Sequence, residues 1–114
     1  MSANQIAKIS PGLREAIAGG DNLCATFVIA GDENRWIQFV GGTVNAAYPH
    51  TQDPAPLIMA LGDAVIESFE PGQYVTVRLQ VVDVYSIARW IDRYFEQVLA
   101  ADNDYSVDVT LESL

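Results

Sequence analysis

The chain has 114 residues, half of them apolar, which is long enough for one domain with its own core, and we treat residues 1–114 as a single domain. Fifteen acidic residues against six basic ones give a net charge of −9, which argues against nucleic acid and anionic membrane surfaces as partners. The single cysteine, Cys24, excludes an intrachain disulfide and a zinc site built from several cysteines.

No apolar run approaches the ~18 residues that a membrane-spanning helix needs. The first residues, MSANQIAKISPG, lack the basic and apolar blocks of a secretory signal. We therefore expect a cytoplasmic protein without a membrane partner.

The first predicted helix covers residues 10–19, SPGLREAIAG. Ser10 suits the N-cap, Pro11 suits the first turn, and Gly19 followed by Gly20 suits the end.

A hairpin signature follows, with β-rich runs at residues 24–30 and 35–40 flanking the turn sequence GDEN. Gly41 and Gly42 make a second turn into the predicted strand TVNAAY. The three segments predict an antiparallel meander in which Ile37 and Phe39 share one face.

The middle of the chain begins with PHTQDPAP, which breaks regular structure, and Asp53 is a good start for a short helix. Residues 63–69 fit either helix or strand. Because glycine inside a helix costs about 1 kcal/mol relative to alanine, we expect a break at Gly62. After the turn EPGQ, the segment YVTVRLQV alternates apolar and polar residues, which predicts a strand with one side facing water.

The segment DVYSIARWIDRYFEQVL predicts a long amphipathic helix with Asp83 as its N-cap. Burial of five large apolar side chains from its stripe contributes on the order of 10 kcal/mol before entropy is subtracted. We expect the other side to carry Arg89, Asp92, Arg93, Glu96 and Gln97. The last segment, YSVDVTLESL, alternates again and predicts an edge or terminal strand.

These elements predict an α+β fold. Its antiparallel sheet contains the three-strand meander and one to three further strands, with two or three helices packed on one face.

Motifs for catalysis, metal binding and cofactor binding are not recognisable, so we expect no catalytic residue, no metal and no cofactor. One alternative stays open. His50 with Asp53 and Tyr48 could form a small-molecule site in which His50 is a general base. A loop histidine beside a proline is more often only a turn residue.

Surface aromatic residues offer a different kind of site. If Ile37 and Phe39 face the helices, their strand neighbours point to the opposite side of the sheet. Trp90 lies away from the centre of the long helix's apolar stripe. Tryptophan and arginine are enriched where proteins bind each other. The predicted partner-binding residues are Trp36, Gln38, Val40, Trp90 and Arg93.

The order of elements resembles the YbjN and TY-Chap group of small bacterial domains, which has a type III secretion chaperone-like fold. The segments that carry the resemblance are WIQFVGGTVNAAYPH, LIMALG with PGQYVTV after it, and DVYSIARWIDRYFEQVL. The resemblance covers roughly residues 10–100. It implies no catalytic residues and a homodimer that binds proteins, with a sheet or helix surface holding an extended segment of the partner.

We therefore expect a non-enzymatic, chaperone-like or adaptor module with a protein partner of unknown identity. Two other hypotheses remain: an acidic immunity-type protein that masks a basic toxin, and a small-molecule-binding domain or enzyme with its site near His50.

Overall fold

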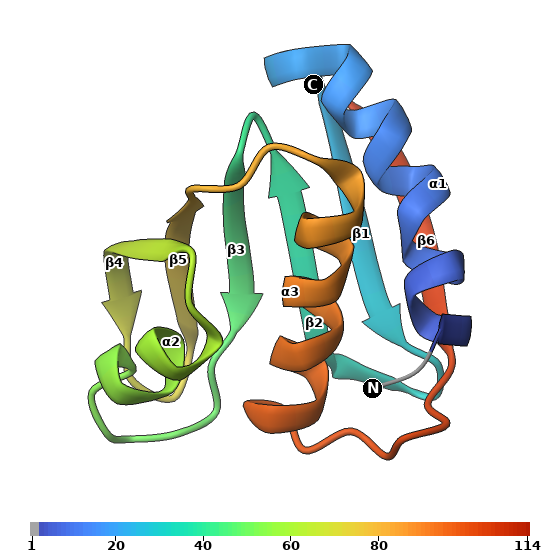
Figure 1. Cartoon of the computed structure of the whole chain (residues 1–114). Helices are drawn as coiled ribbons and strands as arrows, with labels where there is room; N and C mark the ends of the chain where they lie inside the picture. Colours follow the sequence, from blue (N-terminus) through green and yellow to red (C-terminus); the bar gives the residue numbers. More distant parts are fainter. Residues whose placement is uncertain (1–2) are drawn as a thin grey trace.

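The computed structural model of the protein describes residues 3–114, which form three α-helices and six strands (Figure 1). In chain order the elements are α1 (Ala3–Gly19), β1 (Leu23–Ile29), β2 (Asp32–Val40), β3 (Thr43–Ala47), α2 (Ala55–Leu61), β4 (Ala64–Glu70), β5 (Tyr74–Leu79), α3 (Val84–Gln97) and β6 (Val107–Ser113).

All six strands belong to one antiparallel sheet in the order β4-β5-β3-β2-β1-β6. The three helices lie on the same side of this sheet, with α1 over β1 and β6 and α3 over the middle (Figure 1). The predicted α+β fold is confirmed. No helix within residues 3–114 has the length and apolar character to cross a membrane.

The first helix begins well before residue 10, so the predicted start was wrong. Ser10 lies inside α1, where its hydroxyl donates a hydrogen bond to the Ile6 carbonyl at 2.6 Å instead of capping the helix. Pro11 also lies inside the helix. The buried stripe starts at Ile6 and continues through Ile9 and Leu13. Burial of these side chains outweighs the local start signals, because a helix gains most of its stability from its packed face.

The predicted meander is confirmed, and its register places Phe27 beside Ile37 and Phe39 beside Val44. The first turn is shorter than expected because β2 already begins at Asp32. The second turn uses Gly41 and Gly42, which both have positive φ, at 57° and 81°.

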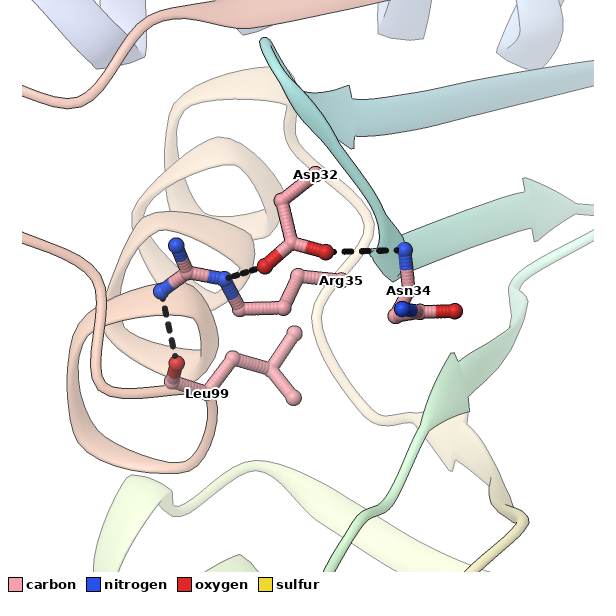
Figure 2. A network of polar contacts seen from close by, with 4 residues as sticks. All are labelled: Asp32, Asn34, Arg35 and Leu99. Carbon is pink, nitrogen blue, oxygen red and sulfur yellow. Dashed lines mark hydrogen bonds and ion pairs between the residues drawn. The ribbon is translucent and has the colours of Figure 1, made fainter.

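A polar network attaches this hairpin to the end of α3 (Figure 2). The Asp32 carboxylate accepts hydrogen bonds from the Asn34 backbone N–H at 3.1 Å and from the Arg35 Nε at 2.8 Å. The Arg35 Nη1 donates to the Leu99 carbonyl at 3.0 Å. Asp32 is therefore held by groups of this chain, and it fixes the arginine that reaches the segment just after α3.

The ambiguous segment is the strand β4. Gly62 ends α2 with φ of 76°, and its N–H donates to the carbonyls of Ile58 and Met59. The expected break at Gly62 is confirmed, since the positive φ is one that glycine adopts without strain.

The long helix α3 starts as predicted, with the Asp83 Oδ2 accepting a hydrogen bond from the Ser86 N–H at 2.9 Å. This backbone hydrogen bond lowers the pKa of Asp83. Ile87, Ile91 and Phe95 are fully buried and belong to the core between α3 and the sheet. The last strand, β6, is an edge strand, as the alternation predicted, and the structure pairs it with β1.

Candidate functional site

One side of the sheet carries no helix, and its residues follow from the register. Directly paired residues of antiparallel strands share a face. The row Thr26, Gln38, Asn45 and Thr76 therefore lies opposite the helix-covered row that contains Phe39 and Val44. We call this helix-free side the open face. On β1, β2 and β3 the half-buried residues of this face are Thr26, Val28, Trp36, Gln38, Val40, Thr43 and Asn45, and its buried residues are Cys24 and Ala47.

The centre and the margins of the open face differ in charge. The open-face residues just named on β1, β2 and β3 are uncharged, whereas charged residues lie on the flanking strands β4, β5 and β6: Glu67, Glu70, Arg78, Asp108 and Glu112. Two of these form an ion pair, since the Arg78 Nε lies 3.0 Å from the Glu67 Oε2. A neutral centre with a charged margin is the common anatomy of a protein–protein interface.

Trp36, Gln38 and Val40 lie together on β2, in the neutral centre of the open face. Each is half-buried, and Trp36 also packs against the core. Their predicted position, opposite Ile37 and Phe39, is confirmed because the latter two are buried under the helices. That these residues bind a partner stays a prediction.

Trp90 was predicted to bind a partner, but the structure buries it within this chain. The side chain is only 3% exposed. Its indole Nε1 donates a hydrogen bond to the Gly62 carbonyl at 3.0 Å, and its ring stacks on Tyr94 with the ring centroids 5.5 Å apart. Helix α2 and the turn after it cover this side of α3, which the periodicity of α3 alone does not show.

Arg93 is half-buried, and its guanidinium is used within the chain. It donates to the carbonyls of Leu61 at 3.2 Å and Ala60 at 3.1 Å, which are carbonyls at the C-terminal end of α2. A cation is favoured there because the last carbonyls of a helix lack intrahelical donors. These contacts account for the position of Arg93 without a partner.

The residues of the alternative site near His50 are also held by this chain. The His50 Nε2 lies 2.8 Å from the Val98 carbonyl, to which it donates, and the Tyr48 hydroxyl donates to the Gln52 carbonyl at 2.8 Å. The Asp53 carboxylate accepts from the N–H of Ala55 at the start of α2. Within residues 3–114 the hydrogen bonds of His50 and Asp53 go to separate backbone groups, so the two side chains do not form the pair that a general base would use.

The sequence did not indicate a buried carboxylate, yet the structure contains one. Asp92 was expected on the outer side of α3, but it is fully buried and accepts a hydrogen bond from the Tyr105 hydroxyl at 2.8 Å. Burial raises the pKa of Tyr105, and so do this hydrogen bond and the charges of Asp92 and Glu96. Asp92 lies four residues after Ala88 of the apolar stripe, and this spacing is a weak signal of burial. Both groups are shielded from solvent, so the pair links α3 to the segment before β6.

An apolar hollow of about 240 Å³ lies between the end of α1, the β2–β3 turn and the start of α3, and Ile17, Phe39 and Val82 are among its lining residues. Its lining contains no titratable or nucleophilic side chain. Within the described part of the chain, no three His, Cys, Asp or Glu residues are grouped so that they could hold a metal ion.

No protein-family model, curated protein or solved structure matches this chain. The resemblance to the YbjN and TY-Chap group therefore stays a prediction.

Proposed function

We propose that this protein is a non-enzymatic protein-binding module that holds a partner protein against the open face. The observation that carries the proposal is the uncovered, uncharged centre of the sheet, where Trp36 lies opposite Val28 of β1 and precedes Gln38 by two residues on β2. An antiparallel sheet can keep one face in water, but that face is then usually polar. Valine and tryptophan side chains in the middle of a free face are typical of a contact surface.

The chaperone-like or adaptor role belongs to this proposal, as does a cytoplasmic location. The side chains that could have supported a catalytic alternative are engaged elsewhere, since His50 and Asp53 hydrogen-bond to the backbone. Trp36 is in the opposite situation: no hydrogen bond within residues 3–114 uses its indole N–H. A partner group can accept from it, and tryptophan is the residue type most enriched among interface hot spots.

Affinity capture from a lysate of the source cells tests the proposal. Wild-type protein is expected to retain a partner that Trp36→Ala loses, with an affinity at least ~30-fold weaker, because truncation of a central hot spot costs about 2 kcal/mol or more. The matched control is Tyr85→Ala, which removes an exposed aromatic side chain from α3 on the other side of the molecule. Circular dichroism establishes that both variants are folded. Equal capture by Trp36→Ala and Tyr85→Ala would refute the open face as the binding surface.

A second copy of the chain is the other occupant of the open face, since the resemblance to the YbjN and TY-Chap group implies a homodimer. Light scattering on the wild type and on Trp36→Ala distinguishes the two occupants. A wild-type mass of twice 12.4 kDa that falls to 12.4 kDa in the variant assigns the open face to the second copy. A mass of one chain for both proteins leaves the face to a different protein.

A further inference from the structure

The two edges of the sheet are built differently. At one edge, β4 contains an irregularity between Ile66 and Ser68, and the residue between them, Glu67, is held by Arg78. At the other edge, β6 pairs with β1 over seven residues without any interruption. Bulges and twisted or covered strands protect an edge from pairing with another chain. Of the two edges, β6 is therefore the one that can accept a further strand.

The backbone groups that would pair with this strand follow from the register. The Ala30 N–H donates to the Ser106 carbonyl, and the Leu114 N–H donates to the Asn22 carbonyl. In an antiparallel ladder, alternate residues turn both backbone groups toward the same neighbour. The backbone N–H and C=O groups of Ser106, Asp108 and every second residue after them therefore point to β1. The N–H and C=O groups of Val107, Val109, Leu111 and Ser113 point to the free edge.

The side chains of β6 specify what kind of strand fits. On the open face, β6 carries Asp108 and Glu112 with Thr110 between them. On the helix-covered face, Val107 is buried, but Leu111 remains 36% exposed beside α1. Every second side chain of an added strand would lie next to the carboxylates of Asp108 and Glu112. The remaining side chains of that strand would lie next to Val109 and Leu111. Opposite charges across neighbouring strands are favourable. The matching segment therefore alternates basic and apolar residues.

A polar cleft extends this edge beyond the first residue of β6. It has a volume of about 420 Å³ and lies between the first turns of α1, with Asn4 and Lys8, and residues 103–108. Because the cleft includes Val107 and Asp108, it is continuous with the free edge. A segment longer than β6 can continue into it.

We propose that the β6 edge binds an extended, alternately basic and apolar segment of a partner protein by antiparallel strand addition. The chain's net charge of −9 favours a basic partner over a second copy, because two β6 strands would bring Asp108 and Glu112 of both copies together. This inference rests on the proposed function, since it specifies the chemistry of the partner. Strand addition at β6 uses residues other than Trp36, so experiments can refute this inference and the proposed role of the open face separately.

Fluorescence anisotropy with a labelled peptide of about eight residues that alternates lysine and valine tests the edge. The full chain is expected to bind it about tenfold more tightly than a peptide with glutamate in place of lysine, and to bind it more weakly as salt is added. The double variant Asp108→Asn, Glu112→Gln is expected to bind about threefold to tenfold more weakly. The control Glu67→Gln, Glu70→Gln, on the β4 edge, is expected to bind as the wild type does.

Methylation of the peptide nitrogens tests the hydrogen bonds without changing the protein. Residues opposite Val109 and Leu111 are valines in the proposed register, and their N–H groups face β6. N-methylation of the valines is expected to abolish binding, whereas N-methylation of the lysines leaves it. Equal effects of the two methylated peptides, or unchanged binding by the Asp108→Asn, Glu112→Gln variant, would overturn the proposal. Trp36→Ala is expected to bind the peptide like the wild type, so the capture experiment tests the open face independently.

Discussion

Buried aromatic residues show how single side chains connect the layers of this protein. The Tyr94 hydroxyl on α3 donates to the Ala47 carbonyl of β3 at 2.7 Å, and the Trp90 indole donates to the Gly62 carbonyl. Tyr105 donates to Asp92. A buried polar group without a partner costs about 1–3 kcal/mol, so these large rings are positioned by one directed hydrogen bond each.

The tyrosines predict how stability depends on pH. Burial raises the pKa of Tyr94 and of Tyr105. In the unfolded chain tyrosine loses its proton near pH ~10. Above that pH the unfolded state binds fewer protons than the folded state. The stabilisation that these protonated tyrosines give the folded state is therefore complete below pH ~10. It is lost as the pH rises toward the tyrosine pKa values of the folded state.

We expect the free energy of unfolding to fall by about 1.4 kcal/mol per pH unit for each buried tyrosine above pH ~10. Urea unfolding between about pH 9 and about pH 11.5 measures the slope. Tyr94→Phe and Tyr105→Phe should each reduce it, whereas the exposed Tyr85→Phe should keep it. A free energy that stays constant over this range would contradict the prediction.

At the scale of elements, helices meet the sheet and each other through a few close contacts. A Cβ on Gly12 of α1 would lie 2.8 Å from the Val109 Cγ1 of β6, so the missing side chain allows the helix to approach the edge strand. On the other side of the molecule, Arg93 joins α3 to the end of α2. Both contacts hold a peripheral element against the central core.

We expect Gly12→Ala to destabilise the protein by about 1 kcal/mol or more, although alanine favours helices by about that amount. The reason is the overlap with Val109. In a Val109→Ala background the same change should become neutral or stabilising, and a double-mutant cycle by urea unfolding measures the coupling. Additive effects of the two substitutions would show that α1 adjusts to the extra methyl group.

Arg93→Ala should loosen α2, because the carbonyls of Ala60 and Leu61 lose a charged donor. Removal of such a hydrogen bond typically costs about 1.5–3 kcal/mol, and this half-exposed pair belongs at the low end of that range. Hydrogen exchange should accelerate at the amides of residues 58–62 and in β4. The exposed Arg89→Ala on the same helix is the control and should leave the exchange unchanged. Similar protection in both variants would remove the proposed role of Arg93.

At the scale of the whole molecule, charge is the dominant feature. The chain carries fifteen acidic side chains, and its longest dimension is 34 Å. Two ion pairs, of Arg35 and Arg78, lie among the described residues. The Debye length is about 30 Å at 0.01 M salt and about 8 Å at 0.15 M. At low salt the acidic groups therefore repel each other across the entire molecule.

We expect the melting temperature to rise by a few degrees between about 0.01 M and about 0.15 M NaCl, because screening weakens this repulsion. Scanning calorimetry measures the shift. The variant Asp108→Asn, Glu112→Gln should show a smaller rise, since it begins with two fewer negative charges. A melting temperature that falls with salt would mean that the ion pairs contribute more than the repulsion.

The sequence by itself determined the strands of the meander, β5, the long helix and the side of the sheet on which Trp36, Gln38 and Val40 lie. Alternation along a strand and spacing along a helix reflect local backbone geometry, so they can be recognised without knowing the neighbours. Glycines at the turns also indicated where the neighbouring helices and strands end.

Only the tertiary structure decided the rest. Ser10 and Pro11 lie inside α1 because the stripe before them is buried against the sheet. Trp90 and Arg93 face α2, and Asp92 meets Tyr105, because the side of α3 that was expected to be outer is covered by other parts of the chain. The place of β6 beside β1 joins residues as distant as Leu23 and Ser113. Such neighbours depend on how the elements assemble, and no periodicity within one element encodes them.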